Sequence, residues 1–95
     1  GTTLSWQEME SASLSESIPD RLTKTNGSNL GPFLRGHFRS GDSEKALLLY
    51  VDTSQPPFVY LMMKDQLVIL NAGGREQTEA LYQTIAEHIG LTEQK

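Results

Sequence analysis

Three cationic or titratable side chains recur at every second position of one short segment: Arg35, His37 and Arg39. Alternate residues of a β-strand point to the same side, so a strand over residues 34–39 would present these three side chains in one row. Guanidinium groups pair well with carboxylate and phosphate groups. The row therefore predicts a surface for an anionic headgroup or an acidic peptide. The simpler interpretation is that the row is the solvent-facing side of a two-sided strand.

Further basic residues could extend this row. We expect Lys45 to join it from the neighbouring strand if the hairpin register allows, and Arg21 and Lys24 to contribute from the preceding segment. Residues 21–45 hold five basic and two acidic residues, and the chain on either side of them is acidic. A modest basic segment indicates where an anion would bind. It does not match the extended basic surface of a nucleic-acid-binding protein, so no nucleic-acid partner is predicted.

Residues suited to catalysis or metal binding are few. The two histidines, His37 and His88, lie on a predicted strand face and near a predicted helix end. A hydrolytic triad needs a serine, a histidine and an acid that converge in space, and the serines cluster in the N-terminal stretch without a Gly-x-Ser-x-Gly turn. The chain has no cysteine, no pair of histidines one helical turn apart and no Asp-rich calcium loop. We predict a protein that is not an enzyme and that holds no metal or other cofactor.

The segment Asn71-Ala-Gly-Gly-Arg75 raises a separate phosphate hypothesis. It joins a predicted strand to a predicted helix, and the free N–H groups of a helix N-terminus bind anions. The segment matches neither the dinucleotide-binding fingerprint nor the phosphate-binding loop of nucleotide hydrolases. A connection that needs positive φ angles explains its two glycines equally well.

A β-rich fold must position these residues. Residues 34–70 contain four successive apolar segments, separated by Gly, Pro, Ser and Asp, that predict four strands. Residues 57–63 are apolar on both strand faces, so this strand must lie centrally or be covered on both sides. Asn26 and Gly27 predict a two-residue turn, which residues 28–32 lengthen into a loop of about eight residues.

The two ends of the chain add weaker strands and one helix. Residues 2–8 predict a weak strand or a turn, residues 12–17 predict a clearer strand, and Met9 breaks the alternation as a bend or bulge would. Residues 75–89 carry apolar side chains at helical spacing, and Gly90 fits the position that ends such a helix.

Length and composition restrict the class of protein. The chain has 95 residues, 37% of them hydrophobic, and a net charge of −4, which predicts one small soluble domain. No apolar run approaches the roughly 18 residues that would span a bilayer. Gly1 is not preceded by a methionine, which suggests that the sequence is trimmed and leaves open an upstream signal or membrane anchor.

The order of these features resembles bacterial pleckstrin-homology-like domains. The resemblance covers residues 18–85 and is carried by Thr25-Asn-Gly27, Arg35-Gly-His-Phe-Arg39, Gly41 with Lys45, Pro56-Pro-Phe-Val-Tyr60, Lys64-Asp65, Asn71 and Glu76-x-x-Glu-x-x-Leu-Tyr82. It implies a strongly bent antiparallel sheet or a partly open barrel, closed at one end by the C-terminal helix. It carries no catalytic residues and does not establish phosphoinositide binding. A full domain of this family would have about seven strands, and the exposed edge left by a missing hairpin could pair with a second copy.

These observations together predict a mainly β (α+β) domain over residues 1–95. It would have N-terminal strands over residues 1–17, an antiparallel meander over 18–71 and a closing helix over 75–89, with six or seven strands in all. The predicted function is a non-catalytic interaction module of a larger, membrane-anchored bacterial protein, which contacts a protein partner or forms a strand-paired homodimer. Contact with the membrane would be indirect, through an anchor outside this sequence. One alternative is an anion or lipid-headgroup binder that uses the basic residues named above. Another is an accessory or inhibitory domain whose edge strand pairs with a partner.

Overall fold

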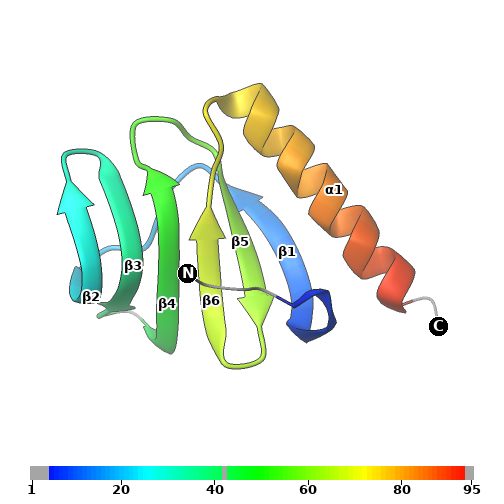
Figure 1. The fold of residues 1–95 in the computed structure, drawn as a ribbon, viewed down its shortest axis with the longest axis horizontal. Helices are drawn as coiled ribbons and strands as arrows, with labels where there is room; N and C mark the ends of the chain where they lie inside the picture. The colour runs from blue at the N-terminus through cyan, green and yellow to red at the C-terminus, as the bar shows by residue number, and fades with distance from the viewer. Residues whose placement is uncertain (1–4, 42, 94–95) are drawn as a thin grey trace.

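One mixed, open sheet of six strands carries a single C-terminal helix in the computed structural model, which describes residues 5–41 and 43–93 (Figure 1). The strand order across the sheet is β1-β5-β6-β4-β3-β2. The predicted mainly β fold with one C-terminal helix is confirmed. In chain order the elements are the 3-10 turn η1 (Trp6–Glu8), β1 (Met9–Ser15), β2 (Leu22–Leu30), β3 (Phe33–Ser40), β4 (Ser43–Asp52), β5 (Phe58–Met63), β6 (Gln66–Leu70) and α1 (Arg75–Glu93).

The sheet departs from a simple meander after β4. Strands β2, β3 and β4 pair antiparallel in succession, and β5 pairs antiparallel with both β1 and β6. Strand β6, however, inserts between β4 and β5 and runs parallel to β4, with Leu48 opposite Val68. The predicted antiparallel meander over residues 18–71 is therefore wrong at this crossing. Apolar alternation indicates which face of a strand is buried, but it does not identify the neighbouring strand.

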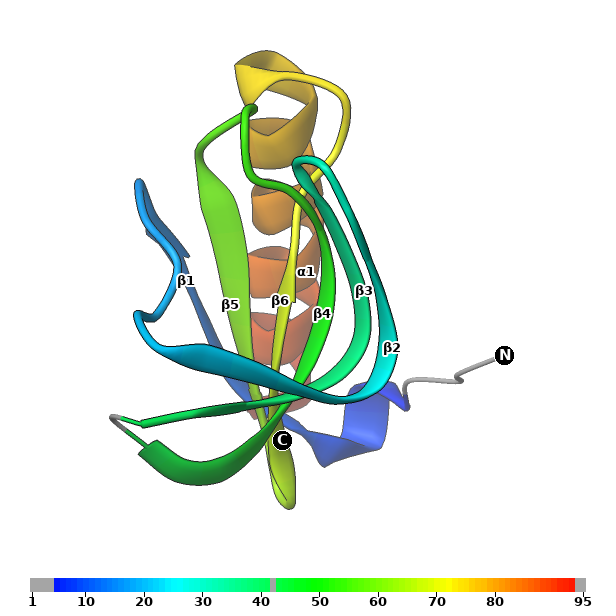
Figure 2. The same ribbon diagram turned by 90° about the vertical axis from the view of Figure 1, so that its left-hand side faces the viewer.

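The β2–β3 hairpin bends sharply around a pair of facing glycines. Gly27 lies directly opposite Gly36, which has a φ of +108°. A Cβ on Gly36 would lie 2.5 Å from the carbonyl oxygen of Asn26, and a Cβ on Gly27 would collide with the carbonyl oxygen of Arg35. The two backbones can approach this closely only because both residues lack a side chain. The lower half of the hairpin consequently sweeps across the sheet (Figure 2).

The predicted turn at Asn26 and Gly27 is wrong, because both residues lie inside β2. The chain reverses at Gly31 and Pro32, which are the last two residues of the predicted loop, and the rest of that loop is part of β2. Gly27 serves the close approach to the neighbouring strand rather than a turn. A register shift between Lys24 and Asn26 marks a bulge in the same strand, and bulges of this kind increase local twist.

The sheet is buried on both faces, which is why its central strands are apolar at nearly every position. Strand β5 lies between β1 and β6, as its two-sided apolar pattern predicts. On one face the helix covers a cluster of Leu48, Val59, Leu61, Met63 and Val68 with Ile85 and Ile89. On the concave face, which the bent hairpin and the β1–β2 connection cover, a second cluster contains Phe38, Leu47, Leu49, Val51, Phe58 and Ile69, with Ile18 and Leu22 packed against it.

Helix α1 begins at Arg75 as predicted but continues through Gly90 to Glu93, so the predicted end at residue 89 is wrong. A Cβ on Gly90 would meet nothing within 4 Å. The helix packs against β1, β5 and η1, and the Trp6 ring of η1 stacks on His88 with ring centroids 3.9 Å apart. Among the residues that the structure describes, no helix is long and apolar enough to cross a membrane.

The N-terminal part forms one strand, preceded by a 3-10 turn in the segment for which a weak strand or a turn was predicted. The segment 2–8 contains the 3-10 turn η1, while its residues 2–4 lie outside the described residues. Strand β1 spans Met9–Ser15 and pairs with β5 of the same chain. The irregularity predicted at Met9 is confirmed by a register shift between Met9 and Ser11.

Candidate binding pocket

The basic row of β3 has the predicted alternation. Arg35, His37 and Arg39 are exposed, whereas the residues between them are half-buried or buried. Arg35 pairs with Tyr50 across the β3–β4 ladder, and His37 pairs with Leu48. Cross-strand partners point to the same face, and Leu48 and Tyr50 pack in the cluster beneath α1. The row therefore lies on the helix side of the sheet, next to the area that α1 covers.

The other three predicted basic residues do not join this row. Lys45 lies on the concave side, where its Nζ donates to Met62 Sδ at 2.9 Å and to the Met63 carbonyl oxygen at 3.3 Å. Lys24 pairs with Phe38, a residue of the concave cluster. Arg21 belongs to the β1–β2 connection, and its carbonyl oxygen accepts a hydrogen bond from Gly41 N–H beyond the end of β3. The register of the two hairpins, which the sequence does not reveal, separates these residues from the row.

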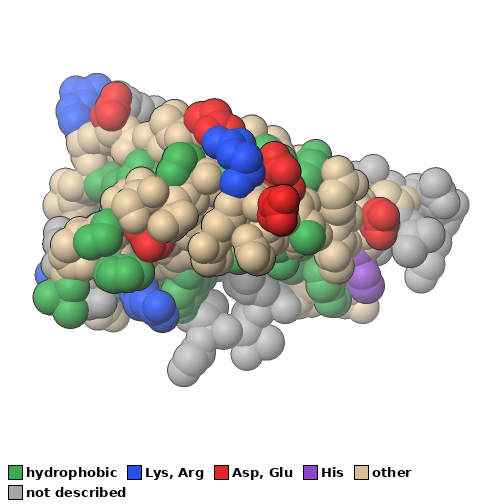
Figure 3. Space-filling model, turned by 90° about the horizontal axis from the view of Figure 1, so that it is seen from above, with side chains coloured by type: hydrophobic (Ala, Val, Ile, Leu, Met, Phe, Trp, Pro, Cys, Tyr) green, Lys and Arg blue, Asp and Glu red, His purple; other side chains and the backbone are tan. Residues whose placement is uncertain are grey.

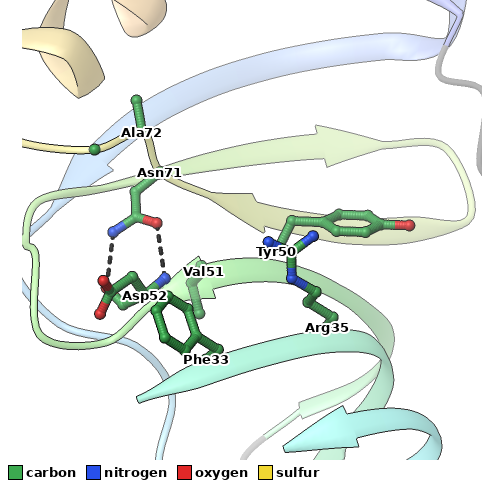
Figure 4. A pocket seen from close by; sticks show the side chains of 8 residues that line it. Phe33, Arg35, Tyr50, Val51, Asp52, Asn71 and Ala72 are labelled. Atoms are coloured by element: carbon green, nitrogen blue, oxygen red, sulfur yellow. Dashed lines mark hydrogen bonds between the residues drawn. The ribbon is translucent and has the colours of Figure 1, made fainter. Parts of the chain in front are cut away.

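One end of the basic row opens into a pocket of about 410 Å³. Strand β3 contributes Arg35, the one residue of the predicted set that lines this pocket. Strand β4 and the connection from β6 to α1 provide the opposite wall (Figure 4). We call this cavity the Arg35 pocket; its lining residues are Phe33, Arg35, Tyr50, Val51, Asp52, Asn71, Ala72 and Gly73.

The side chain of Asn71 holds the wall of the pocket in place. Its Oδ1 accepts a hydrogen bond from Asp52 N–H at 2.9 Å, and its Nδ2 donates to the carbonyl oxygens of Asp52 and Gln55, both at 2.9 Å. The next residue is also fixed, because Ala72 N–H donates to the Oγ1 of the fully buried Thr78 at 2.9 Å. These bonds tie the end of β6 to the β4–β5 loop and to the first turn of α1. The pocket is thus preformed on a rigid frame.

Of the two described charged side chains that line the pocket, one has no partner among the described residues. The Asp52 carboxylate accepts hydrogen bonds from Ser54 N–H at 2.9 Å and Ser54 Oγ at 2.5 Å, and it points away from Arg35 (Figure 4). The guanidinium of Arg35, which extends from β3 towards the opposing Tyr50, makes no hydrogen bond or ion pair with any residue that the structure describes. Its donors are available to a ligand.

The tip of the β2–β3 hairpin adds an apolar surface to the pocket. Leu30 and Phe33 face each other across the turn and are 74% and 47% exposed, the highest values among the large hydrophobic side chains that the structure describes. Phe33 also lines the pocket. Seen from this end of the molecule, hydrophobic side chains reach the surface over the hairpin beside basic ones (Figure 3, left). We call Leu30, Phe33, Arg35 and Tyr50 together the tip surface.

Sequence reasoning missed three residues of this surface, and Leu30 was one of them because it was placed in a loop. The strand was predicted to begin at residue 34, which left out Phe33, although extending the alternation by one residue places Phe33 in the row with Arg35. Tyr50 was interpreted only as part of the apolar strand over residues 45–51, with no role in a binding site. The sequence of β4 is apolar at every position from Ala46 to Val51, so nothing in the sequence marks Tyr50 as a residue at the margin of the helix-covered area.

The predicted phosphate-binding connection has its cation already paired. Arg75 donates to both carboxylate oxygens of Glu16, at 2.9 and 2.7 Å, and lies 3.9 Å from Glu79. The hydrogen bond from Arg75 lowers the pKa of Glu16 below its ordinary value of 4.5. This contact ties the segment after β1 to the start of α1, where acidic and basic side chains mix in the centre of Figure 3. Arg75 therefore has a structural role.

The described residues offer little to a catalytic or metal site. No group of three histidine, aspartate or glutamate residues that could hold a metal ion occurs in the part of the chain that the structure describes. His88 is engaged in the stack on Trp6, and His37 stands exposed on β3.

Comparison with other proteins returns no match: no protein-family model, curated protein or solved structure matches this chain. The resemblance to bacterial pleckstrin-homology-like domains stays a prediction. The parallel pairing of β4 with β6 differs from the wholly antiparallel sheet that the resemblance implies.

Proposed function

We propose that this chain is a non-catalytic interaction module that binds a protein partner through the tip surface. The observation that carries the proposal is the hairpin tip itself. Two large apolar side chains are exposed there, next to a preformed pocket with an unpartnered guanidinium. Protein interfaces have this composition, in which aromatic residues and arginine are enriched at the points of strongest contact.

The exposure of Leu30 supports a partner rather than an internal packing role. Leu30, the last residue of β2, is 74% exposed, whereas Leu47, Leu48 and Leu49 of β4 are fully buried. Burying a leucine side chain in a partner's pocket contributes about 1.5–3 kcal/mol. A second copy paired edge to edge would be held mainly by backbone hydrogen bonds, so Leu30 would not be its main contact.

The two edge strands are poorly suited to pairing with another strand. Both contain irregularities, between Met9 and Ser11 in β1 and between Lys24 and Asn26 in β2. Bulges and an edge lysine are devices that reduce edge-to-edge association. The strand-paired homodimer stays an untested prediction, and we place the contact on the tip surface instead.

The cellular setting that we propose is a larger, membrane-anchored bacterial protein. This part of the proposal is supported by the resemblance described above and by the small size of the folded unit.

A selection from a random dodecapeptide library displayed on phage tests the proposed function. The wild-type domain is the bait, and the enriched clones are then assayed against Leu30→Ser and against the matched control Leu14→Ser. Leu14 is 37% exposed on β1, so both variants lose one exposed leucine from an edge strand. We expect the enriched clones to lose binding to Leu30→Ser and to keep it to Leu14→Ser. No enrichment, or equal binding to both variants, would contradict the proposed surface.

A further inference from the structure

We propose that the Arg35 pocket recognises an aspartate or glutamate side chain of the bound partner, in an extended segment with an apolar residue two positions away. This inference rests on the proposed function and specifies the chemistry of the partner. It gives Arg35 a role that none of the other basic residues of the row shares.

The first argument concerns the state of the guanidinium. Arg35 has no ionic partner among the described residues, whereas Arg75 is held by Glu16. Arg35 projects from the middle of a paired strand towards Tyr50, and strand pairing restricts where the guanidinium can lie. An arginine fork matches the two oxygens of a carboxylate, and such charge-assisted bonds are roughly twice as strong as neutral ones.

The second argument concerns the charge that the pocket can accept. The charged side chains of its lining are Arg35 and Asp52, and the Asp52 carboxylate is already satisfied by Ser54. The hydrogen bonds from Ser54 leave the Asp52 carboxylate negatively charged, so any anion that binds Arg35 is also repelled by Asp52. A carboxylate brings one negative charge into the pocket and a phosphate group up to two, so this repulsion is smaller for a carboxylate. The lining therefore favours a carboxylate over a phosphate.

The third argument concerns spacing. Phe33 and Arg35 are two residues apart on the same face of β3, which places their Cα atoms about 7 Å apart. An extended partner segment presents its own residues i and i+2 on one side at the same spacing. An acidic residue opposite Arg35 thus places an apolar residue two positions away opposite Phe33. Leu30, across the turn from Phe33, extends the apolar contact.

The test is a pair of blocked pentapeptides titrated into the isotope-labelled domain and followed by NMR. The probe is acetyl-Leu-Ser-Glu-Ser-Leu-amide, which offers a leucine two residues from the acid in either chain direction. Its matched control carries Gln in place of Glu. We expect the Glu peptide to shift the amide resonances of Phe33, Tyr50 and Gly73, and to bind about tenfold more tightly than the Gln peptide.

Two domain variants make the assignment specific. Arg35→Gln removes the free guanidinium, and Lys64→Gln removes an exposed cation from the β5–β6 hairpin, with the same change in net charge. We expect Arg35→Gln to abolish the preference for the Glu peptide and Lys64→Gln to retain it. The spectra of the unbound variants show whether each remains folded.

Equal affinity for the two peptides, or a preference that survives in Arg35→Gln, would overturn the inference. Pocket resonances that shift with protein concentration alone would identify a second copy of the chain as the occupant, and would also overturn it. If displayed peptides depend on Leu30 while the Glu and Gln pentapeptides bind alike, the carboxylate preference fails and the proposed function stands. If neither dependence is seen, both fail.

Discussion

The facing glycines of the β2–β3 hairpin predict that Gly36→Ala is strongly destabilising. The φ of +108° is one that residues with a side chain rarely adopt, and such strain costs about 1–3 kcal/mol. The new Cβ would also lie 2.5 Å from the Asn26 carbonyl oxygen and 2.7 Å from the Gly27 Cα. Overpacking of this kind costs about 1–3 kcal/mol more. We therefore expect the free energy of unfolding to fall by about 2–6 kcal/mol.

Urea denaturation followed by circular dichroism measures this loss, with thermal melting as a second readout. For a domain of this size a loss of 2 kcal/mol lowers the melting temperature by about 8–16 °C. Gly73→Ala is the matched control, because a Cβ at Gly73 would meet nothing within 4 Å, and we expect it to change stability by less than about 0.5 kcal/mol. If Gly36→Ala were as stable as Gly73→Ala, the close approach of the two strands would not exist.

Three further predictions concern the helix and the frame of the pocket. Gly90→Ala should stabilise the domain by about 0.5–1 kcal/mol in urea denaturation, because Gly90 lies inside α1 with open space around it; destabilisation would mean that the helix ends earlier. Asn71→Asp should destabilise the domain by about 2–3 kcal/mol, because the variant loses two donated hydrogen bonds and places a charge beside the Asp52 carbonyl oxygen. An unchanged melting temperature would show that the Asn71 side chain does not hold the wall of the pocket in place. Arg75→Gln should raise the pKa of Glu16 towards its ordinary value of 4.5 in an NMR pH titration. The pair stabilises the fold above that pH and loses this contribution as the pH falls through the lowered pKa, so an unshifted Glu16 titration would exclude the ion pair in solution.

The sequence predicted which face of each strand is buried better than it predicted which strands lie next to each other in the sheet. Alternation placed Arg35 and His37 on one side of β3, and the two-sided apolar pattern of residues 57–63 predicted a central strand. These are local consequences of the period of two in a strand. The parallel contact of β4 with β6 depends on a crossing between distant segments, and no local pattern encodes it.

Glycine was the main source of error in the local predictions. Asn26 and Gly27 have the composition of a hairpin turn, but Gly27 is needed for the approach to Gly36. Gly90 has the composition of a helix end, yet the helix continues through it. Glycine permits a turn or a helix end but does not require one, and in both cases its presence was taken as evidence that the chain turns or the helix ends.

The candidate site was predicted in part. Arg35 was identified from its alternation with His37 and Arg39, but the bulge in β2 and the hairpin register carry Lys24 and Lys45 to the concave side. The wall of the pocket depends on Asn71 and its bonds to the β4–β5 loop, which join residues far apart in the sequence. Such contacts follow from the strand order and are not visible before it is known.

The affinity of the strongest displayed peptide for Phe33→Ser tests the central claim most directly. Isothermal titration calorimetry would compare this variant with the wild type and with Trp6→Ser, a second exposed aromatic residue that lies at the helix rather than at the hairpin tip. A buried aromatic contact contributes about 1.5–3 kcal/mol to the binding free energy, so its loss raises the dissociation constant at least about tenfold. We expect that weakening for Phe33→Ser and an affinity within about twofold of the wild type for Trp6→Ser. Equal affinities for all three proteins would show that the tip surface is not where the partner binds.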